Sequence, residues 1–314
     1  MPLSPEARTL LDMAYRVGAP KFHELSPVQA RHSFQKLQFA FRPEAPAVAS
    51  TTEVPIARAD GSALLARLYR PLHSPTQETL PLLIYFHGGG WCVGDVTSYD
   101  VLCRQLANAS GCAVLSVDYR LAPEHPFPAA LDDAAFAFEW AVAQADLLGV
   151  DPARIALGGD SAGGNLSIVT ALSLRGATIE PRFLLLVYPS TEIHSARASR
   201  QRYGEGYFLD FGTLQWFFER YLPKGDAEHW RASPMRAESL VGLPPMMLIS
   251  AEFDPLVDDC AAFAQRVREE GGEVECLQVE GVLHGFITLG KLFPQADAAI
   301  EAAAAALARA LGVP

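Results

Sequence analysis

A serine between small residues separates an apolar run from a helical pattern, and this feature limits the possible folds most strongly. The segment Gly159-Asp160-Ser161-Ala162-Gly163 follows the apolar residues 154–157 and precedes the apolar-rich residues 165–172. A serine on a strand-to-helix turn has a strained backbone and needs small neighbours. The turn exposes the hydroxyl at the carboxyl edge of a sheet, where the helix N-terminus adds partial positive charge. The segment therefore predicts a nucleophilic serine in an α/β fold.

A second glycine-rich segment lies upstream and supplies what a serine nucleophile needs. His87-Gly88-Gly89-Gly90-Trp91 follows the apolar run 82–86, which is typical of a buried strand. Consecutive glycines let backbone amides turn toward a bound oxyanion, because no Cβ is in the way. A plain flexible turn is the alternative. A phosphate-binding loop fits poorly, because neither Gly-Lys-Ser/Thr nor the G-x-G-x-x-G register is present.

Strand and helix signals alternate along most of the chain, and this alternation predicts a mainly parallel sheet with helices on both faces. The predicted strands of that sheet are 82–86, 113–117, 154–157, 183–188, 246–250 and, less regular, 274–279. Before these strands, we expect two helices, which start at Ser4-Pro5 and Ser26-Pro27, and then a linker at 43–51. A hairpin should follow, with strands from Val54 to Ala59 and from Leu64 to Tyr69 and a turn at Asp60-Gly61. The Ala-rich tail from Ala298 to Leu311 is predicted to be a closing helix.

The interval between strands 183–188 and 246–250 is longer than a simple crossover and is rich in aromatics. Its aromatic residues are Tyr203, Tyr207, Phe208, Phe211, Trp216, Phe217, Phe218 and Tyr221. A buried amphipathic helix explains part of this set. A lid over an apolar substrate would need the same residues, and we weigh the two interpretations equally.

The serine requires a base, and the base requires an orienting carboxylate. In sheets of this type the acid follows the nucleophile in the chain, on a loop after a strand. Asp254 follows the run 246–250 and precedes Pro255, which fixes the turn. Asp258, Asp259 and Glu252 compete for the same role.

His284 is the best candidate for the base. It follows the run 274–279, and Gly281 and Gly285 leave room around it. A single histidine after a strand is more often structural than catalytic. His125 competes weakly because it precedes the nucleophile, and His87 is expected to brace the glycine loop.

Composition excludes several classes of function. The net charge of −11 argues against nucleic acid and anionic membrane surfaces as partners. Residues 1–6 lack the features of a signal peptide, and no apolar run reaches 18 residues, so no membrane span is expected. The five cysteines include no Cys-x-x-Cys pair, which favours a reduced cytoplasmic protein. The histidines show no ligand spacing, so no metal is expected.

Taken together, these motifs resemble the hormone-sensitive-lipase-like branch of the α/β-hydrolases, especially its bacterial carboxylesterases. The resemblance spans residues 85–286 and includes Asp118 to Glu124, Asp254-Pro255-Leu256 and His284-Gly285-Phe286 besides the two glycine-rich segments. It implies an α/β-hydrolase fold with an eight-stranded, mainly parallel sheet, flanking helices and a helical cap. The implied organisation is 1–45 (part of the cap), 46–189 (core), 190–235 (cap insertion) and 236–314 (core).

The resemblance also implies roles for single residues. Ser161 would be the nucleophile, His284 the general acid and base, and Asp254 its partner. The oxyanion hole would comprise Gly88, Gly89, Gly90 and Ala162, with Gly88 shaping the loop and the other three donating amides. Asp118 to Glu124 would support that loop. The candidates for substrate binding are Trp91, Tyr188, Tyr207, Phe208, Trp216 and Phe286.

The implied activity is hydrolysis of short- to medium-chain carboxylic esters through an acyl-enzyme, without a cofactor. One alternative is a non-catalytic ligand-binding protein on the same fold. Another is an amidase or lactonase with the same three residues, because the choice of scissile bond depends on pocket shape. The sequence leaves the oligomeric state open. A homodimer through an exposed edge at 274–279 is one option.

Overall fold

The computed structural model describes residues 2–58, 61–73, 79–223 and 225–313. The strands are Ser50–Ala57 (β1), Ala63–Arg70 (β2), Leu80–Phe86 (β3), Ala113–Asp118 (β4), Val150–Asp160 (β5), Leu184–Val187 (β6), Met246–Phe253 (β7) and Val274–Leu283 (β8). The α-helices are Pro5–Arg16 (α1), Pro27–Phe41 (α2), Asp100–Ser110 (α3), Ala129–Ala143 (α4), Ala145–Leu148 (α5), Ala162–Ser173 (α6), Ala198–Arg202 (α7), Phe211–Tyr221 (α8), Val257–Glu269 (α9) and Gln295–Leu311 (α10). Short 3₁₀ turns are Phe22–Glu24 (η1), Pro234–Arg236 (η2) and Phe286–Thr288 (η3).

The strands form one eight-stranded sheet in the order β1-β2-β4-β3-β5-β6-β7-β8. The pairs β1–β2 and β2–β4 are antiparallel, and the pairs from β4–β3 to β7–β8 are parallel. This confirms the predicted α/β-hydrolase fold with a mainly parallel sheet. The hairpin is confirmed, although β1 begins at Ser50, inside the predicted linker 43–51. Ala59 of its first predicted strand and Asp60 of its predicted turn lie outside the described residues.

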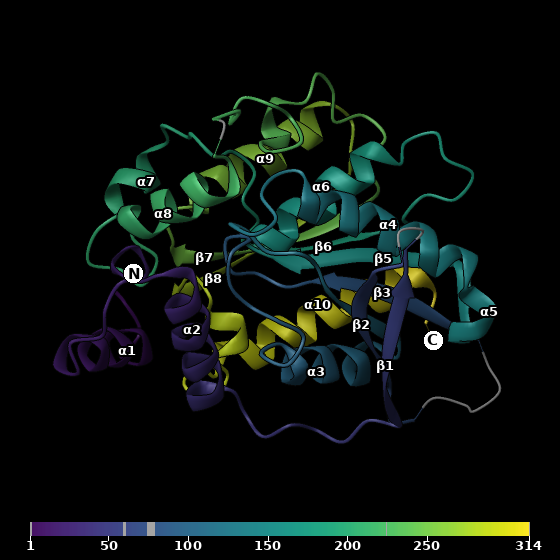
Figure 1. Ribbon diagram of the computed structural model, residues 1–314, viewed down its shortest axis with the longest axis horizontal. Helices are drawn as coiled ribbons and strands as arrows, with labels where there is room; N and C mark the ends of the chain where they lie inside the picture. Colours follow the sequence, from purple (N-terminus) through teal and green to yellow (C-terminus); the bar gives the residue numbers. More distant parts are fainter. Residues whose placement is uncertain (1, 59–60, 74–78, 224, 314) are drawn as a thin grey trace.

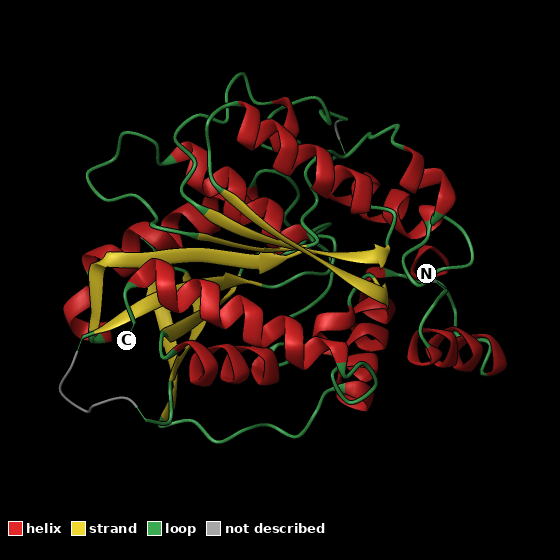
Figure 2. Cartoon of the chain, turned by 180° about the vertical axis from the view of Figure 1, so that it is seen from behind, coloured by secondary structure: helices red, strands yellow, loops and turns green. Residues whose placement is uncertain are grey.

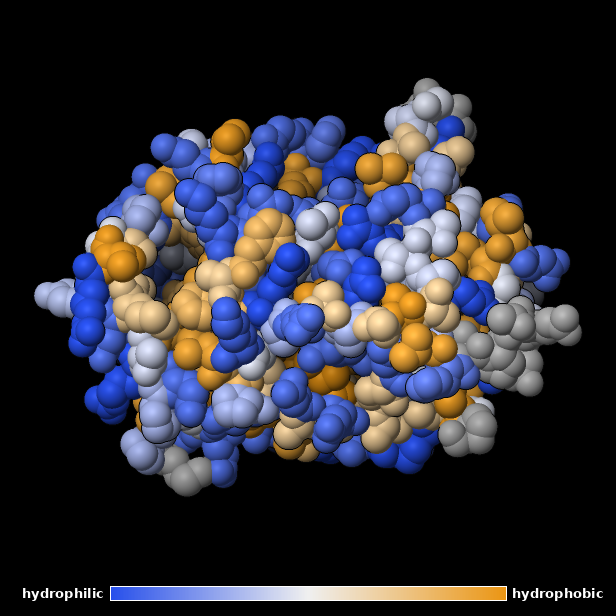
Figure 3. All heavy atoms as spheres, turned by 90° about the horizontal axis from the view of Figure 1, so that it is seen from below, coloured by the Kyte–Doolittle hydropathy of each residue, from blue (hydrophilic) through white to orange (hydrophobic). Residues whose placement is uncertain are grey.

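Helices cover both faces of the sheet, which explains why its central strands are continuous apolar runs. Helices α4, α6 and α9 lie above the sheet in Figure 1, and α3 and α10 pack together below it. All seven residues of β3 are buried, and so are all four of β6. Viewed from below, hydrophilic and hydrophobic residues are intermingled over the surface (Figure 3).

The N-terminal helices begin where their caps predict. The Ser4 hydroxyl accepts a hydrogen bond from the Ala7 amide, and Ser26 forms a capping box with Gln29. Several strand arrowheads point toward the side of the molecule on which these helices lie (Figure 2). The carboxyl edge of the sheet therefore faces the N-terminal segment.

Helix α8 lies in the aromatic-rich interval and packs against the N-terminal segment. Phe217 meets Phe22 edge-on at 5.8 Å between ring centroids, and the Trp216 indole donates a hydrogen bond to the Leu25 carbonyl. Trp216 and Phe217 are buried, whereas Phe211 is 60% exposed. The interpretation as a buried amphipathic helix therefore holds for part of the aromatic set.

Candidate active site

Ser161 occupies the turn between β5 and α6. Its φ is 53°, a left-handed conformation that is uncommon for a residue with a side chain. A Cβ at Gly159 or Gly163 would collide with the Phe86 carbonyl of β3. Both glycines are therefore needed for the turn to pass this close to the neighbouring strand.

A chain of hydrogen bonds joins the serine to a histidine and a carboxylate. The His284 Nε2 lies 3.0 Å from Ser161 Oγ, and the His284 Nδ1 lies 2.7 Å from Asp254 Oδ2. Asp254 is fully buried, and its other carboxylate oxygen accepts the Leu256 amide at 2.8 Å. The carboxylate is thus fixed in place, and it holds the ring with Nε2 toward the serine. This is the arrangement that a base-activated nucleophile requires.

The competing carboxylates point elsewhere. Asp259 binds Arg197 and Arg200, and Asp258 accepts the Ser199 amide. Glu252 accepts the amide of Gly281 at 2.7 Å. Among these carboxylates, Asp254 is therefore the one that the structure places against His284, in agreement with its predicted position at the strand end.

The glycine loop carries two backbone amides that can serve a ligand. Among the residues that the structure describes, the Gly89 and Gly90 amides have no hydrogen-bond acceptor. Ala162 is the first residue of α6, where an amide lies outside the helical hydrogen-bond ladder. These three donors are available to an oxyanion.

The Gly88 amide is already used. It donates to Asp160 Oδ1 at 2.8 Å and lies 3.1 Å from the Tyr99 hydroxyl oxygen. The Tyr85 and Tyr99 hydroxyls donate to the same carboxylate, each at 2.9 Å. Gly88, which the resemblance assigns to the oxyanion hole, therefore shapes the loop and is not one of the donors.

The segment 118–124 lies behind the loop. The Tyr119 hydroxyl donates to the His87 carbonyl at 2.7 Å, and its ring stacks on the His87 ring at 4.3 Å. The Ala122 amide donates to the Trp91 carbonyl at 2.9 Å. His87 itself is buried, and its ring also packs against the ring of Tyr99. This position suits a residue that braces the loop and does not suit a catalytic base.

Arg31 of α2 connects the N-terminal segment to the same loop. Its guanidinium donates to the carbonyls of Cys92 and Ala122 and to both carboxylate oxygens of Glu124. A guanidinium is suited to this position because its planar fork carries five donors.

The six aromatic candidates for substrate binding differ in their surroundings. Trp91 stacks on Tyr221 at 4.2 Å, and the Tyr188 ring lies 4.4 Å from the His284 ring. Trp91, Tyr188, Trp216 and Phe286 are buried, whereas Tyr207 and Phe208 are half-buried. Tyr188 is thus the candidate that directly faces the three-residue site.

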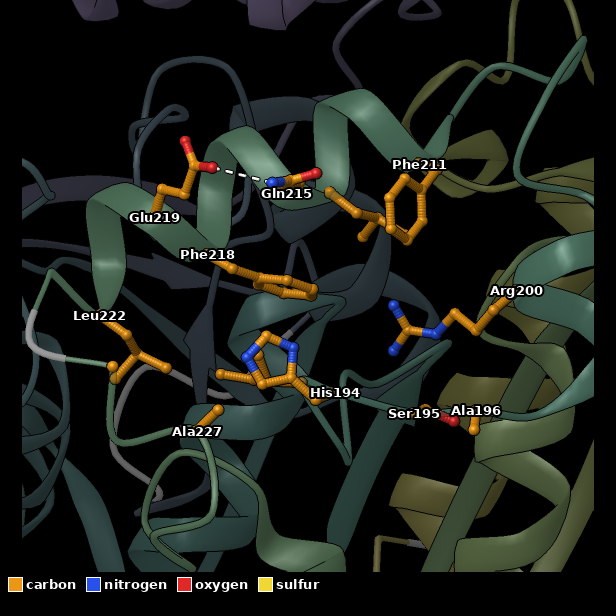
Figure 4. A pocket seen from close by; sticks show the side chains of 13 residues that line it. His194, Ser195, Ala196, Arg200, Phe211, Gln215, Phe218, Glu219, Leu222 and Ala227 are labelled. Carbon is orange, nitrogen blue, oxygen red and sulfur yellow. Dashed lines mark hydrogen bonds between the residues drawn. The ribbon is translucent and has the colours of Figure 1, made fainter.

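A cavity of about 510 Å³ lies within the segment 190–235, and none of the six aromatic candidates lines it. Its lining residues in the described part of the chain all fall between Ile193 and Ala227. Its apolar wall consists of Ile193, Phe211, Leu214, Phe218, Leu222 and Ala227. Figure 4 shows Arg200 reaching into it from α7, opposite Phe218 and His194.

Sequence reasoning missed Asp160, Tyr99, Arg31 and Arg200. Asp160 had one available signal, because it stands inside the serine motif, next to the nucleophile. Arg31 and Glu124 are 93 positions apart, and no local pattern links them.

The comparisons with known proteins agree with this geometry. A model of the alpha/beta hydrolase fold matches residues 83–288. An ethyl acetate hydrolase of Pseudomonas putida is 36% identical over 88% of this chain and 87% of its own length. An ester hydrolase from the metagenome of Lake Arreo, solved with a bipyridine phosphonate derivative, has a TM-score of 0.95 and 40% identity over 99% of this chain and 100% of its own. The esterase of Pyrobaculum calidifontis has a TM-score of 0.89 and 35% identity over 98% and 99% of the two chains.

Proposed function

This chain belongs to the hormone-sensitive-lipase-like family of the α/β hydrolases and is a carboxylesterase. On that premise, we propose that it hydrolyses esters of short to medium chain length with Ser161, His284 and Asp254 as its catalytic residues. The observation that carries the proposal is the hydrogen-bond chain from Ser161 through His284 to Asp254, at 3.0 and 2.7 Å.

The first half of the reaction transfers the acyl group to the enzyme. Ser161 Oγ attacks the ester carbonyl while its proton passes to His284 Nε2. The bond between the carbonyl carbon and the alkoxy oxygen then breaks, and His284 gives that proton to the leaving alcohol. In the second half, water attacks the acyl-enzyme with His284 again as the base, and the acid product leaves.

The oxyanion formed in both halves would be held by the amides of Gly89, Gly90 and Ala162. Loss of one such donor costs roughly 3 kcal/mol of transition-state stabilisation in comparable sites. A fixed loop would therefore contribute substantially to the rate.

The test is kcat/KM for p-nitrophenyl esters from acetate to palmitate, on the parent and on Ser161→Ala. We expect activity that peaks at short to medium chains and is lost in the variant. Undiminished hydrolysis by the folded variant would refute the role of Ser161. Hydrolysis of amides or lactones in preference to esters would refute the proposed substrate class.

We further propose that residues 1–45 and 190–235 act together as a cap over the site. The contacts of Phe22 with Phe217 and of Leu25 with Trp216 support this, because they join the two segments. Removing the N-terminal segment should change the chain-length preference in the same ester series.

A homodimer is proposed through β8. This strand is at an edge of the sheet, and its residues 274–280 are exposed or half-buried. An open edge offers unpaired backbone groups to a second copy. Light scattering after size exclusion should give twice the chain mass, and the mass of one chain would refute the proposal.

We also propose a cytoplasmic location. All five cysteines are free, and four of them are buried. Free thiols are typical of a reducing compartment. Within the described residues, no helix is long and apolar enough to cross a membrane. Cell fractionation with an antibody to the chain tests the location directly.

A further inference from the structure

We propose that the cavity within the cap insertion is a second small-molecule site, which binds a carboxylate with an apolar tail, the class of acid that ester hydrolysis releases. The choice of this acid rests on the proposed function. The evidence for the site itself is the cavity, whose lining includes neither Ser161 nor His284 nor Asp254.

The cavity has the size and walls of a ligand site. Its volume of about 510 Å³ lies within the range of about 300–1,000 Å³ that is typical of small-molecule pockets. Leu214, Phe218 and Leu222 give it an apolar wall, which suits a hydrocarbon tail. Phe218 also contacts Trp91, with 6.4 Å between ring centroids, so this side chain stands between the cavity and the glycine loop.

One buried cation faces the apolar wall. Arg200 is only 8% exposed, and its guanidinium carbon lies 5.9 Å from the centre of the Phe218 ring. Figure 4 shows the guanidinium pointing into the space between Phe218 and His194. A charged group in such a position is costly unless it is paired and hydrogen-bonded.

The hydrogen bonds of Arg200 leave one nitrogen open. Its Nε donates to Asp259 at 2.8 Å, and its Nη2 donates to the Glu192 carbonyl at 2.8 Å. Within the part of the chain that the structure describes, Nη1 has no acceptor. Because the other two nitrogens are fixed, an acceptor in the cavity can meet a donor that is already oriented.

The open nitrogen of Arg200 favours an anionic acceptor. Three arginines, Arg197, Arg200 and Arg236, share the two buried carboxylates of Glu192 and Asp259. The exposed Glu228 balances the third positive charge by binding Arg236, and solvent screens this exposed pair more than the buried ones. An ionised carboxylate forms shorter and stronger hydrogen bonds to a guanidinium than a neutral oxygen does.

Among the described lining residues, one side chain is acidic. Glu219 is exposed, and its carboxylate accepts a hydrogen bond from Gln215 at 3.0 Å. Figure 4 shows both residues on the opposite side of α8 from Phe218. The head group would therefore lie near Arg200, with the tail along Phe218 and Leu222.

The experiment separates this site from the acyl site. The p-nitrophenyl ester of an octylphosphonate is first reacted with the enzyme: a bond forms between Ser161 Oγ and phosphorus, p-nitrophenolate leaves, and the serine proton passes to His284. The octyl chain then fills the acyl site. Octanoate and, separately, 1-octanol are titrated into this protein by calorimetry.

We expect one octanoate per chain, with octanol bound at least tenfold more weakly. Ala196→Trp, at an exposed lining position, should weaken octanoate binding at least tenfold. Ala198→Trp, also exposed but outside the lining, is the matched control and should bind like the parent. Arg200→Met should lose the preference for octanoate over octanol.

Three results would overturn the proposal: no octanoate binding, equal binding of octanol, or unchanged binding in Ala196→Trp. If Arg200→Met does not fold, the comparison of octanoate with octanol still decides the role of the head group. If no p-nitrophenolate is released, the proposed role of Ser161 fails instead, while Ala196→Trp still reports on the cavity.

Discussion

The Asp160 carboxylate accepts the Gly88 amide at 2.8 Å, although the two residues are 72 positions apart in the chain. Asp160 precedes the serine, and Gly88 opens the glycine loop. One side chain therefore fixes the nucleophile turn relative to the amides that would hold the oxyanion. Burial raises the pKa of Asp160, and the hydrogen bonds from Tyr99 and Tyr85 oppose that rise.

Asp160→Asn is expected to lower kcat by roughly tenfold to a hundredfold with little change in KM. Asparagine keeps Oδ1, which accepts the Gly88 amide and the Tyr85 hydroxyl, but its NH2 group replaces the Oδ2 that accepts the Tyr99 hydroxyl. The buried Tyr99 hydroxyl, 3.1 Å from the Gly88 amide, would then have to turn or shift, which would disturb the loop while substrate contacts remain. Steady-state kinetics on p-nitrophenyl acetate measures this. A rise in KM at constant kcat would contradict the positioning role.

Gly90→Ala should reduce both stability and activity. Gly90 has a φ of 56°, and an added Cβ would run into the Phe217 ring of α8. Strain from overpacking costs about 1–3 kcal/mol in buried sites. Gly18→Ala is the matched control, because Gly18 has a φ of 58° with nothing within 4 Å. It should cost about 1 kcal/mol and leave kcat unchanged. Urea unfolding and steady-state kinetics on both variants measure the losses of stability and of kcat. Equal losses in the two variants would show that the collision with Phe217 is not their cause.

Cys92 should resist alkylation in the folded protein. It lies beside the glycine loop, and burial raises the pKa of its thiol to about 12, so little thiolate exists near neutrality. Cys276 is exposed and is expected to react first. Mass spectrometry after iodoacetamide treatment at pH 8 identifies the labelled residue. Early labelling of Cys92 with loss of activity would show that this thiol is more accessible than its packing indicates.

Local patterns predicted the sheet, and they singled out Ser161, Asp254 and His284, which the structure brings within hydrogen-bond distance of one another. The turn at Ser161 and the strand ends before Asp254 and His284 are each encoded in fewer than about fifteen consecutive residues, the scale of a single structural element. The carboxyl ends of parallel strands share one edge, so the topology alone brings such residues together.

Contacts between distant segments were not predictable in the same way. Arg31 and Glu124 belong to segments with no shared periodicity, and their pairing depends on how α2 packs on the core. The role of the aromatic residues was also ambiguous in the sequence. Trp91 and Trp216 would give the same hydrophobic pattern whether they pack in the core or contact a ligand. The structure shows both of them buried.

The pair Arg31–Glu124 leads to a prediction about stability and pH. The Arg31 guanidinium holds the pKa of Glu124 below its ordinary value of 4.5. A carboxyl group whose pKa is lowered on folding stabilises the fold above its unfolded pKa. That contribution is lost as the pH falls through the lower, folded value.

Glu124→Gln should therefore lower the free energy of unfolding at pH 7, and the difference from the parent should shrink in acid. Because Glu124 is half exposed, solvent screening limits the loss to about 1 kcal/mol or less. Arg31→Met should cost about 1–3 kcal/mol more, since it also removes the donors to the Cys92 and Ala122 carbonyls. Urea unfolding between pH 3.5 and 8 measures both variants. If the loss in Glu124→Gln stayed constant over that range, the charge of Glu124 would not be its cause.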